Sequence, residues 1–410
     1  MPWQRYHTVW ALLVFGWIGN YMVRMALSPL LSPVMQEFGL SYAEGGFLFS
    51  VFFYGYIVMQ VPAGLLGDRL GRKRVLVAGI LLVAVSSVLT GLASTLIVLG
   101  LARLLTGLAQ GLYFANDRPI IAAATPPDRL AIGQGVSFSG LGLGTVLGVI
   151  VGGALGEVMP WRHVFLVLAV LPLVSATLIG RFIPEAPRGP RAAAPGGSVL
   201  RPRDVFSSRP LWLLSTAGMA PIFCQWLIGT WAPALFVEIG VRDLGRSALF
   251  ASLLGVAALP GLFSVGALSD RLLRRGIGRG PVVAATILAL ALLMAAIGLT
   301  VQWRGPVWLL AGLVFLASFC VWGVWGPGQA LVAELFPQRV MGVAFGFLNA
   351  VSFLASLAAP YVAGWIKDHS GSFAPACYLA ALIGLLGLPL ALLVRVPSAP
   401  PREAAQTWRV

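Results

Sequence analysis

The chain has 410 residues, of which 58% are hydrophobic and only 10% are charged. Soluble globular domains carry about 25% charged residues, so this composition excludes an ordinary water-soluble fold and favours an integral membrane protein. The formal net charge of +14 does not indicate a nucleic-acid partner, because the basic residues fall at the ends of apolar runs and in loops.

Twelve apolar runs are long enough to cross a bilayer, which takes about 20 residues per helix. We therefore predict an all-α membrane protein with spans near residues 9–31, 45–66, 75–94, 98–124, 131–156, 162–183, 210–237, 247–268, 281–302, 306–333, 341–363 and 373–395. The first run is too long and too polar for a cleaved signal peptide, and no small-residue cleavage site follows it. We count it as a spanning helix.

Arg24 lies in the middle of the first span, and helical periodicity places Asn20 and Tyr21 on the same face. A charge at this depth costs roughly 2.5–3.5 kcal/mol on insertion scales, so it usually faces a cavity and serves a function. The first span has no acid that could neutralise Arg24. We interpret Arg24 as the binding residue for an anionic substrate, with Asn20 and Tyr21 beside it; a structural ion pair is the alternative.

The second span offers Tyr54 and Gln60 as further substrate contacts and ends in the segment GLLGDRLGRKR. Within this segment we expect Asp68 to accept hydrogen bonds from a helix N-terminus and to pair with Arg69 or Arg72. These contacts would latch helix ends in one access state. A solvated charge run that only fixes membrane orientation is the alternative.

Four polar side chains of the fourth span fall within an arc of about 120°: Arg103, Gln110, Asp117 and Arg118. Arg103 lies in an RxxxGxxxG pattern, which favours a structural role. Gln110 and Arg118 are candidate substrate contacts, although Arg118 is near enough to the helix end to reach the membrane interface instead. Asp117 is the carboxylate that we place well inside a span.

Asp117 is our candidate for proton coupling. A neighbouring arginine favours the charged carboxylate. An arriving anion that takes over that arginine would leave Asp117 prone to accept a proton, so anion and proton would bind cooperatively. A static ion pair of Asp117 with Arg24, Arg103 or Arg118 is the alternative.

A polar segment rich in Pro, Gly, Ala and Arg separates the sixth and seventh spans. We expect residues 1–183 to form an N-terminal six-helix bundle, residues 184–209 a cytoplasmic linker, and residues 210–410 a C-terminal six-helix bundle with a short cytoplasmic tail. The halves are related, because GALSDRLLRR repeats the acidic-basic loop with Asp270 and Arg271 as its weaker copy. Such internal symmetry is expected of transporters that bind substrate between the repeats.

The second half offers amides and aromatic rings for the substrate. The candidates share faces of the seventh, tenth and eleventh spans, and they are Gln225, Trp322, Trp325, Gln329 and Asn349. A site of this kind suits a monocarboxylate with hydroxyls or with an apolar body. For the two tryptophans, packing between helices or at a membrane interface is the alternative.

Cationic loops resist translocation, so the side with most of the Lys and Arg is expected to be cytoplasmic. This rule places both termini in the cytoplasm, which suits a bacterial inner membrane protein. The basic residues expected on the other side are Arg162, Arg242, Arg246, Arg304 and Lys367.

The motifs GDRLGRKR and RLLTGLAQG, together with the six-plus-six layout, resemble the major facilitator superfamily along essentially the whole chain. The stretch NYMVRMALSPLLSPVMQEFGLSYAEGGFLFSVFFYGY is similar to the organic-anion:proton symporter branch and its organophosphate antiporter relatives. The resemblance implies the major facilitator fold and proton symport of an organic anion. Two departures matter: the seventh span lacks the second arginine of the phosphate antiporters, and Gln110 stands near a position where many symporters have Glu.

The runner-up is a proton-coupled exporter of a drug or lipophilic compound, suggested by the glycine-rich fifth span. We expect no enzyme activity, cofactor or metal, because the sequence has no P-loop, no GxSxG and no metal-binding cluster, and its three cysteines lie in different spans. The expected partners are a small organic anion, a proton and the lipid bilayer, and the chain is expected to work as a monomer.

Overall fold

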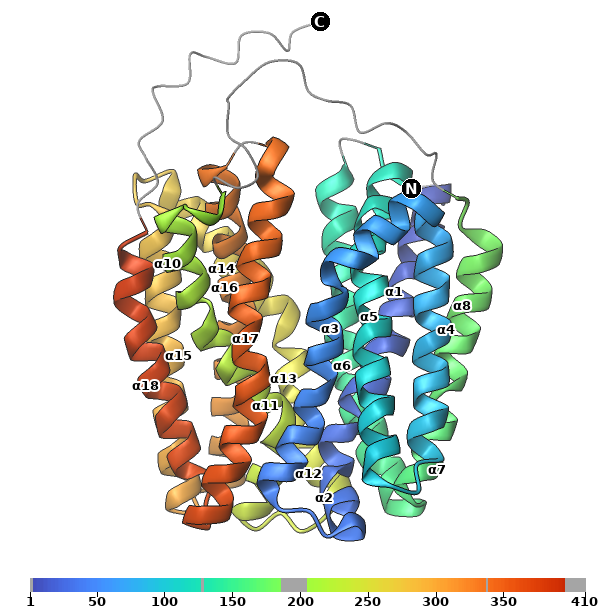
Figure 1. Ribbon diagram of the computed structural model, residues 1–410. Coiled ribbons are helices and arrows are strands. Elements are labelled where there is room, and N and C mark those ends of the chain that lie inside the picture. Colours follow the sequence, from blue (N-terminus) through green and yellow to red (C-terminus); the bar gives the residue numbers. More distant parts are fainter. Residues whose placement is uncertain (1–2, 127–128, 186–204, 337, 395–410) are drawn as a thin grey trace, which may run out of the picture.

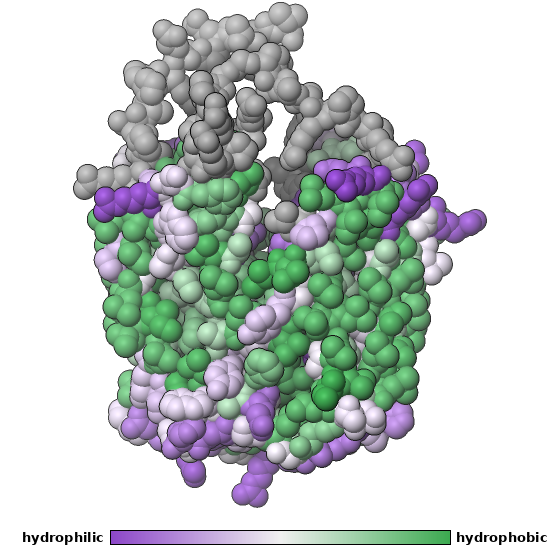
Figure 2. All heavy atoms as spheres, in the orientation of Figure 1, coloured by the Kyte–Doolittle hydropathy of each residue, from purple (hydrophilic) through white to green (hydrophobic). Residues whose placement is uncertain are grey.

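The computed structural model describes residues 3–126, 129–185, 205–336 and 338–394, and every element in these ranges is a helix. Twelve helical segments are long and apolar enough to cross a membrane. Figure 2 shows the corresponding surface, with a broad hydrophobic band around the middle and hydrophilic residues at both ends. The predicted all-α membrane fold is confirmed, and the chain is a multi-pass integral membrane protein.

The helices form two bundles, one from each half of the chain (Figure 1). The first bundle, called the N-lobe here, contains α1 (Arg5–Met25), α2 (Leu27–Phe38), α3 (Tyr42–Leu70), α4 (Arg72–Gly91), α5 (Leu96–Ala124), α6 (Leu130–Val158), α7 (Trp161–Leu168) and α8 (Val170–Phe182). Most of the predicted linker, including residues 186–204, lies outside the described residues. The exact domain boundaries therefore stay a prediction.

The second bundle, the C-lobe, begins with a seventh span in two pieces and ends with the twelfth span. Its helices are α10 (Arg209–Ala217), α11 (Met219–Glu238), α12 (Leu244–Ala251), α13 (Leu253–Val256), α14 (Ala258–Leu273), α15 (Arg279–Gln302), α16 (Val307–Leu335), α17 (Gln338–Ser370) and α18 (Ala374–Leu392). The first span runs to Phe38, beyond the expected residue 31, and the eleventh to Ser370, so that Lys367 lies in a helix and not in a loop.

Prolines explain most of the breaks within the spans. A proline has no N–H and clashes with the carbonyl four residues earlier, so a helix tends to break there. Four helices end at that distance before a proline: α1 at Met25 before Pro29, α7 at Leu168 before Pro172, α10 at Ala217 before Pro221, and α13 at Val256 before Pro260. The first of these breaks follows Arg24 directly.

A stripe of glycines brings α6 against the first span. A Cβ added at Gly140, Gly144, Gly148 or Gly152 would lie within 3.0 Å of atoms of α1 or of Ala26. Small residues at this spacing allow two helix backbones to approach closely. The first and fifth spans therefore pack backbone to backbone between Val14 and Ala26.

The lobes are joined at the end where α2 ends and α12 begins, called the distal end here (Figure 1). Asp368 at the end of α17 accepts hydrogen bonds from the backbone N–H groups of Tyr42 and Ala43 at the start of α3, at 2.9 and 2.8 Å. Glu157 at the end of α6 accepts one from Gly245 at the start of α12, at 2.7 Å. Carboxylates are stabilised at helix N-termini, so each contact is a helix cap supplied by the other lobe.

These two caps are related by the duplication. One joins the eleventh span to the second, and the other joins the fifth to the eighth, so exchanging the halves turns one contact into the other. The opposite end, where α1 begins and α18 ends, is called the proximal end. There, Arg72 pairs with Asp68 and Arg279 pairs with Asp270, each within one lobe. The helix caps supplied by the other lobe thus join the two lobes at the distal end.

Candidate functional site

A cavity lies between the lobes, with an empty volume of about 850 Å³ that includes open solvent at its mouth. Helices of both lobes line it, with Tyr21, Tyr56, Gln60, Phe114, Phe138 and Leu141 from the N-lobe and Gln225, Trp226, Ala258, Leu259, Leu262, Trp322, Trp325, Gly326, Gln329, Asn349 and Phe353 from the C-lobe. Small-molecule sites are commonly lined in this way, mostly by apolar side chains with a few convergent polar groups. We call this space the central cavity.

Arg24 lies just behind the wall of the central cavity, in a cage of aromatic rings. Its side chain is only 4% exposed. The guanidinium carbon lies 4.0 Å from the ring centroid of Phe52, 4.1 Å from Trp226, 4.9 Å from Phe53, 5.2 Å from Tyr21 and 5.9 Å from Tyr56. Rings at this distance attract a cation through their negative faces. Three of them, Tyr21, Tyr56 and Trp226, also line the central cavity.

The cage leaves the charge of Arg24 uncompensated. Its Nε and Nη2 atoms have no hydrogen-bond partner among the described residues, and none of the ion pairs in that part of the chain involves Arg24. Leaving buried charged donors unpaired is expensive. Such a guanidinium is therefore a ready partner for an anion that enters from the cavity.

Arg24 also lies close to contacts between the two lobes. Trp226, the C-lobe member of its cage, packs edge-to-face on Phe53 at 4.6 Å between ring centroids. One helical turn further along the first span, the Ser28 hydroxyl donates to the Thr230 carbonyl across the lobe interface at 3.0 Å. An anion at Arg24 would therefore touch the contact between the lobes.

Asp117 is fully buried and has three partners in the N-lobe. The Trp17 indole N–H donates to Oδ2 at 2.8 Å, the Ser137 hydroxyl donates to the same oxygen at 3.3 Å, and Arg118 Nε lies 3.5 Å from Oδ1. Of the three arginines considered from the sequence, the ion pairs of the described residues join only Arg118 to Asp117. Arg118 also stacks on Phe138, at 3.7 Å from the ring centroid, and Phe138 lines the central cavity.

The C-lobe candidates from the sequence all line the central cavity: Gln225, Trp322, Trp325, Gln329 and Asn349. In the N-lobe, Tyr21 and Gln60 also do so. Tyr54 does not: it is 45% exposed, and the tyrosine of α3 that reaches the cavity is Tyr56, two residues later. Tyr56 lies on the same helix as Tyr54 but on another face, because two residues turn a helix by about 200°.

Two other N-lobe candidates hold helices together. The Gln110 side-chain N–H donates to the backbone carbonyl of Asn20 at 2.6 Å, and both residues are fully buried away from the cavity lining. Arg103 donates to the Thr90 hydroxyl at 2.6 Å and stacks on Phe165 at 5.1 Å. These contacts support the structural role expected for Arg103.

The acidic-basic loops differ in detail from the expectation. Asp68 pairs with Arg72, but the helix N-terminus beside it is met by Glu185, which accepts from Lys73 N–H at 3.1 Å. Sequence reasoning missed Glu185.

In the second copy, Asp270 pairs with Arg279 at 2.7 Å, and not with the neighbouring Arg271. Arg279 also binds Glu334 at 2.7 Å. Arg69 is exposed and forms no ion pair with described residues. Any gating role of these charges stays a prediction.

Sequence reasoning also missed Trp226 and the phenylalanines of the cavity wall, Phe114, Phe138 and Phe353. Nothing in the sequence distinguishes these rings from the many that pack in a membrane protein. The described residues contain no group of three or more His, Cys, Asp or Glu side chains arranged to hold a metal ion.

The sequence matches the family model described as "Major Facilitator Superfamily" over residues 13–301 and 275–409. It is 25% identical to a probable sulfoacetate transporter of Cupriavidus necator, covering 92% of this chain and 91% of the relative. It is 28% identical to a 3-(3-hydroxy-phenyl)propionate transporter of Escherichia coli, covering 81% of this chain and 79% of the relative.

The fold is also similar to that of solved transporters. A bacterial homologue of the human lysosomal transporter Spinster, crystallised in an inward-facing and occupied conformation, superposes with a TM-score of 0.80. The two chains are 17% identical, and the match covers 96% of this chain and 97% of the other. At this identity the likeness shows the fold alone.

Proposed function

Because this chain belongs to the Major Facilitator Superfamily, whose members named above are transporters and not enzymes, we propose that it is a secondary active transporter of a small organic anion. The observation that carries the proposal is Arg24, a buried cation with no hydrogen bond or ion pair among the described residues, behind a cavity between two lobes. An anion bound there would supply the missing charge.

The substrate class follows from the count of charges. Arg24, Arg103 and Asp117 are the charged residues buried among the described part of the chain, and only Arg24 has no side-chain hydrogen bond or ion pair. One uncompensated cation suits a monocarboxylate, a sugar acid or a sulfonate better than a divalent phosphate. The relative named for 3-(3-hydroxy-phenyl)propionate, a monocarboxylate, agrees with this, whereas the sulfoacetate of the other relative is a dianion.

Proton symport follows from the neighbourhood of Asp117. Arg118 contacts both Asp117 and Phe138, so it stands between the buried carboxylate and the wall of the cavity. An anion in the cavity that draws Arg118 away would remove the charge that keeps Asp117 ionised. Anion and proton would then favour each other's binding, and the effect must be reciprocal.

Alternating access would proceed by rocking of the two lobes about the cavity. The distribution of Lys and Arg orients the proximal end, with both termini, to the cytoplasm of a bacterial inner membrane. The distal end, where the lobes are joined, would then face outward, and this structure would be an inward-facing state. Because the cavity lies within one chain, the monomer is sufficient for this cycle.

The test is uptake by proteoliposomes of a panel of mono- and dicarboxylates, sugar acids, sulfonates and lipophilic cations under an imposed pH gradient. We expect accumulation of a monoanion when the outside is acidic, and none when the gradient is collapsed. Extrusion of lipophilic cations against the proton gradient, without anion uptake, would instead support the drug exporter. Silence toward every compound would overturn transport.

A further inference from the structure

A second cavity opens inside the C-lobe, beside the central cavity. It is bounded by α10, α11, α15, α16 and α17 and has an empty volume of about 480 Å³, which includes open solvent. Trp325, Gln329 and Asn349 line both cavities, so they form the boundary between them. We call this second space the side pocket.

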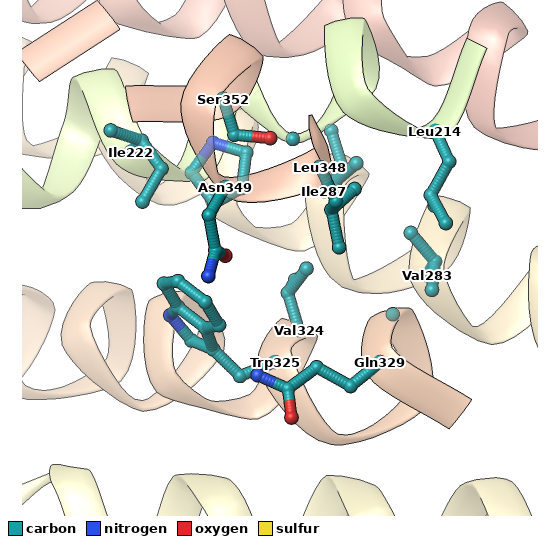
Figure 3. A pocket seen from close by; sticks show the side chains of 13 residues that line it. Leu214, Ile222, Val283, Ile287, Val324, Trp325, Gln329, Leu348, Asn349 and Ser352 are labelled. Carbon is teal, nitrogen blue, oxygen red and sulfur yellow. The ribbon is translucent and has the colours of Figure 1, made fainter. Parts of the chain in front are cut away.

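The interior of the side pocket is aliphatic. In Figure 3 the Asn349 amide and the Trp325 indole lie at one side, and Leu214 and Val283 lie at the other. Ile287 and other aliphatic side chains complete the wall. The pocket therefore has a polar rim at the central cavity and an apolar interior behind it.

Gly328 shows that the side pocket is an open space and not a small packing defect. The residue is buried in α16, yet a Cβ added to it would meet no atom within 4 Å. Gly323 of the same helix is different, because a Cβ there would press on Val265. Buried glycines in this protein usually mark close helix contacts, whereas Gly328 borders a hollow.

We propose that the side pocket receives the apolar end of the transported anion, so that the substrate is an amphiphilic monoanion with an aryl or branched alkyl group. This inference rests on the proposed function and specifies its substrate class. An apolar hollow that joins a binding site adds affinity when an apolar group of the ligand is buried in it. The hydroxyls of a sugar acid would be left without partners against its wall.

A continuous aromatic surface leads from Arg24 to the side pocket. The guanidinium lies 5.9 Å from the Tyr56 ring, Tyr56 lies 5.8 Å from Phe353, and Phe353 lies 6.0 Å from Trp325 at the rim. A molecule with its charge at Arg24 and its apolar group at the rim would touch aromatic rings along its length. The length of the spacer between the two ends should therefore control the affinity.

The first experiment measures binding to the full-length protein in lipid nanodiscs by calorimetry. The probes are phenylacetate, 3-phenylpropanoate and 4-phenylbutanoate, with acetate and D-gluconate as anions without an apolar end. We expect the best phenylalkanoate to bind about 30-fold more tightly than acetate, because a buried phenyl group removes its apolar surface from water. Equal affinity across the series, or a preference for D-gluconate, would overturn the side-pocket proposal.

The second experiment fills the pocket. Gly328→Leu should weaken binding of the best phenylalkanoate about tenfold or more and leave acetate within about twofold of the unmodified protein. The matched control is Gly312→Leu, in the same helix at an exposed glycine whose Cβ also meets no atom within 4 Å. Val283→Phe narrows the pocket from α15 and should repeat the effect if Gly328→Leu fails to fold.

The outcomes separate the two proposals. If anions are taken up but the phenyl series is flat and Gly328→Leu changes nothing, the side pocket is not a substrate site while anion transport stands. If no anion binds and none is transported, the proposed function fails together with it.

Discussion

The two lobes share an architecture but differ in where they keep charge. Among the described residues, the buried charged side chains are Arg24, Arg103 and Asp117, and all three belong to the N-lobe. The C-lobe lines the same cavity with amides, indoles and aliphatic side chains. The two lobes thus share a helix arrangement, but the buried charges lie in the N-lobe, and the C-lobe contributes amides and apolar surface to the cavity.

The largest expected effect breaks this division at its charged side. Arg24→Gln should weaken binding of the best monoanion roughly 100-fold or more, because an ion-paired partner is removed from a desolvated site. Calorimetry in nanodiscs measures the change. Arg24→Lys, which keeps the charge without the planar fork, should recover part of the affinity; equal binding by both variants would show that charge at this position is not what the anion meets.

The next effect separates binding from coupling within the N-lobe. Asp117→Asn should still exchange labelled anion for unlabelled anion, but a one-unit pH gradient should no longer drive the accumulation of about tenfold that a one-to-one symport allows. Counterflow and uptake in the same proteoliposomes measure the two activities. Ser137→Ala removes a hydroxyl donor to Asp117 and serves as the control, with accumulation retained. Full accumulation by Asp117→Asn would assign the proton elsewhere.

A smaller effect concerns the two helix caps that join the lobes at the distal end. Asp368→Ala and Glu157→Ala each remove a helix cap supplied across the interface, and a cap of this kind is worth a population shift of about fivefold. Distances between spin labels at the distal end should report more of the open state in each variant. Glu44→Ala, which removes a capping contact within α3 alone, is the matched control. An unchanged distribution in both variants would show that the caps do not hold this end closed.

The smallest effect concerns the structural arginine. Thr90→Val removes the hydroxyl that accepts a hydrogen bond from Arg103. Because the loss of one hydrogen bond to a charged group destabilises the fold, the thermal unfolding temperature should fall by a few degrees. Affinity for the anion should stay within about twofold. A large loss of affinity with an unchanged unfolding temperature would show that Arg103 acts in the transport site and not as a structural support.

The architecture could be predicted because the bilayer imposes it. A helix that crosses hydrocarbon needs a long apolar run, so twelve runs in the sequence predicted the twelve spans of the structure. Arg24 stood out for the same reason, since a lone charge in such a run is costly wherever the other helices lie. The prolines that stand four residues after four of the helix ends could have been used in the same way.

The details of the site depend on contacts between helices that no single span records. Asp270 pairs with Arg279 on the next helix and not with Arg271 beside it. The cage around Arg24 takes rings from three helices in two lobes, so Trp226 had no local signal. Tyr54 does not line the central cavity for a geometric reason, because Tyr56, which does, is two residues later and therefore on another face of the helix.

The glycine stripe of α6 has a mechanical consequence. Because the backbones of the first and fifth spans are in close contact at these glycines, neither helix can slide past the other without steric clash. Arg24 sits on one member of this pair, and the Glu157 cap terminates the other. We therefore expect this pair to move as one unit, so that a displacement of the first span at Arg24 would also shift Glu157 and the contact that it makes with the other lobe.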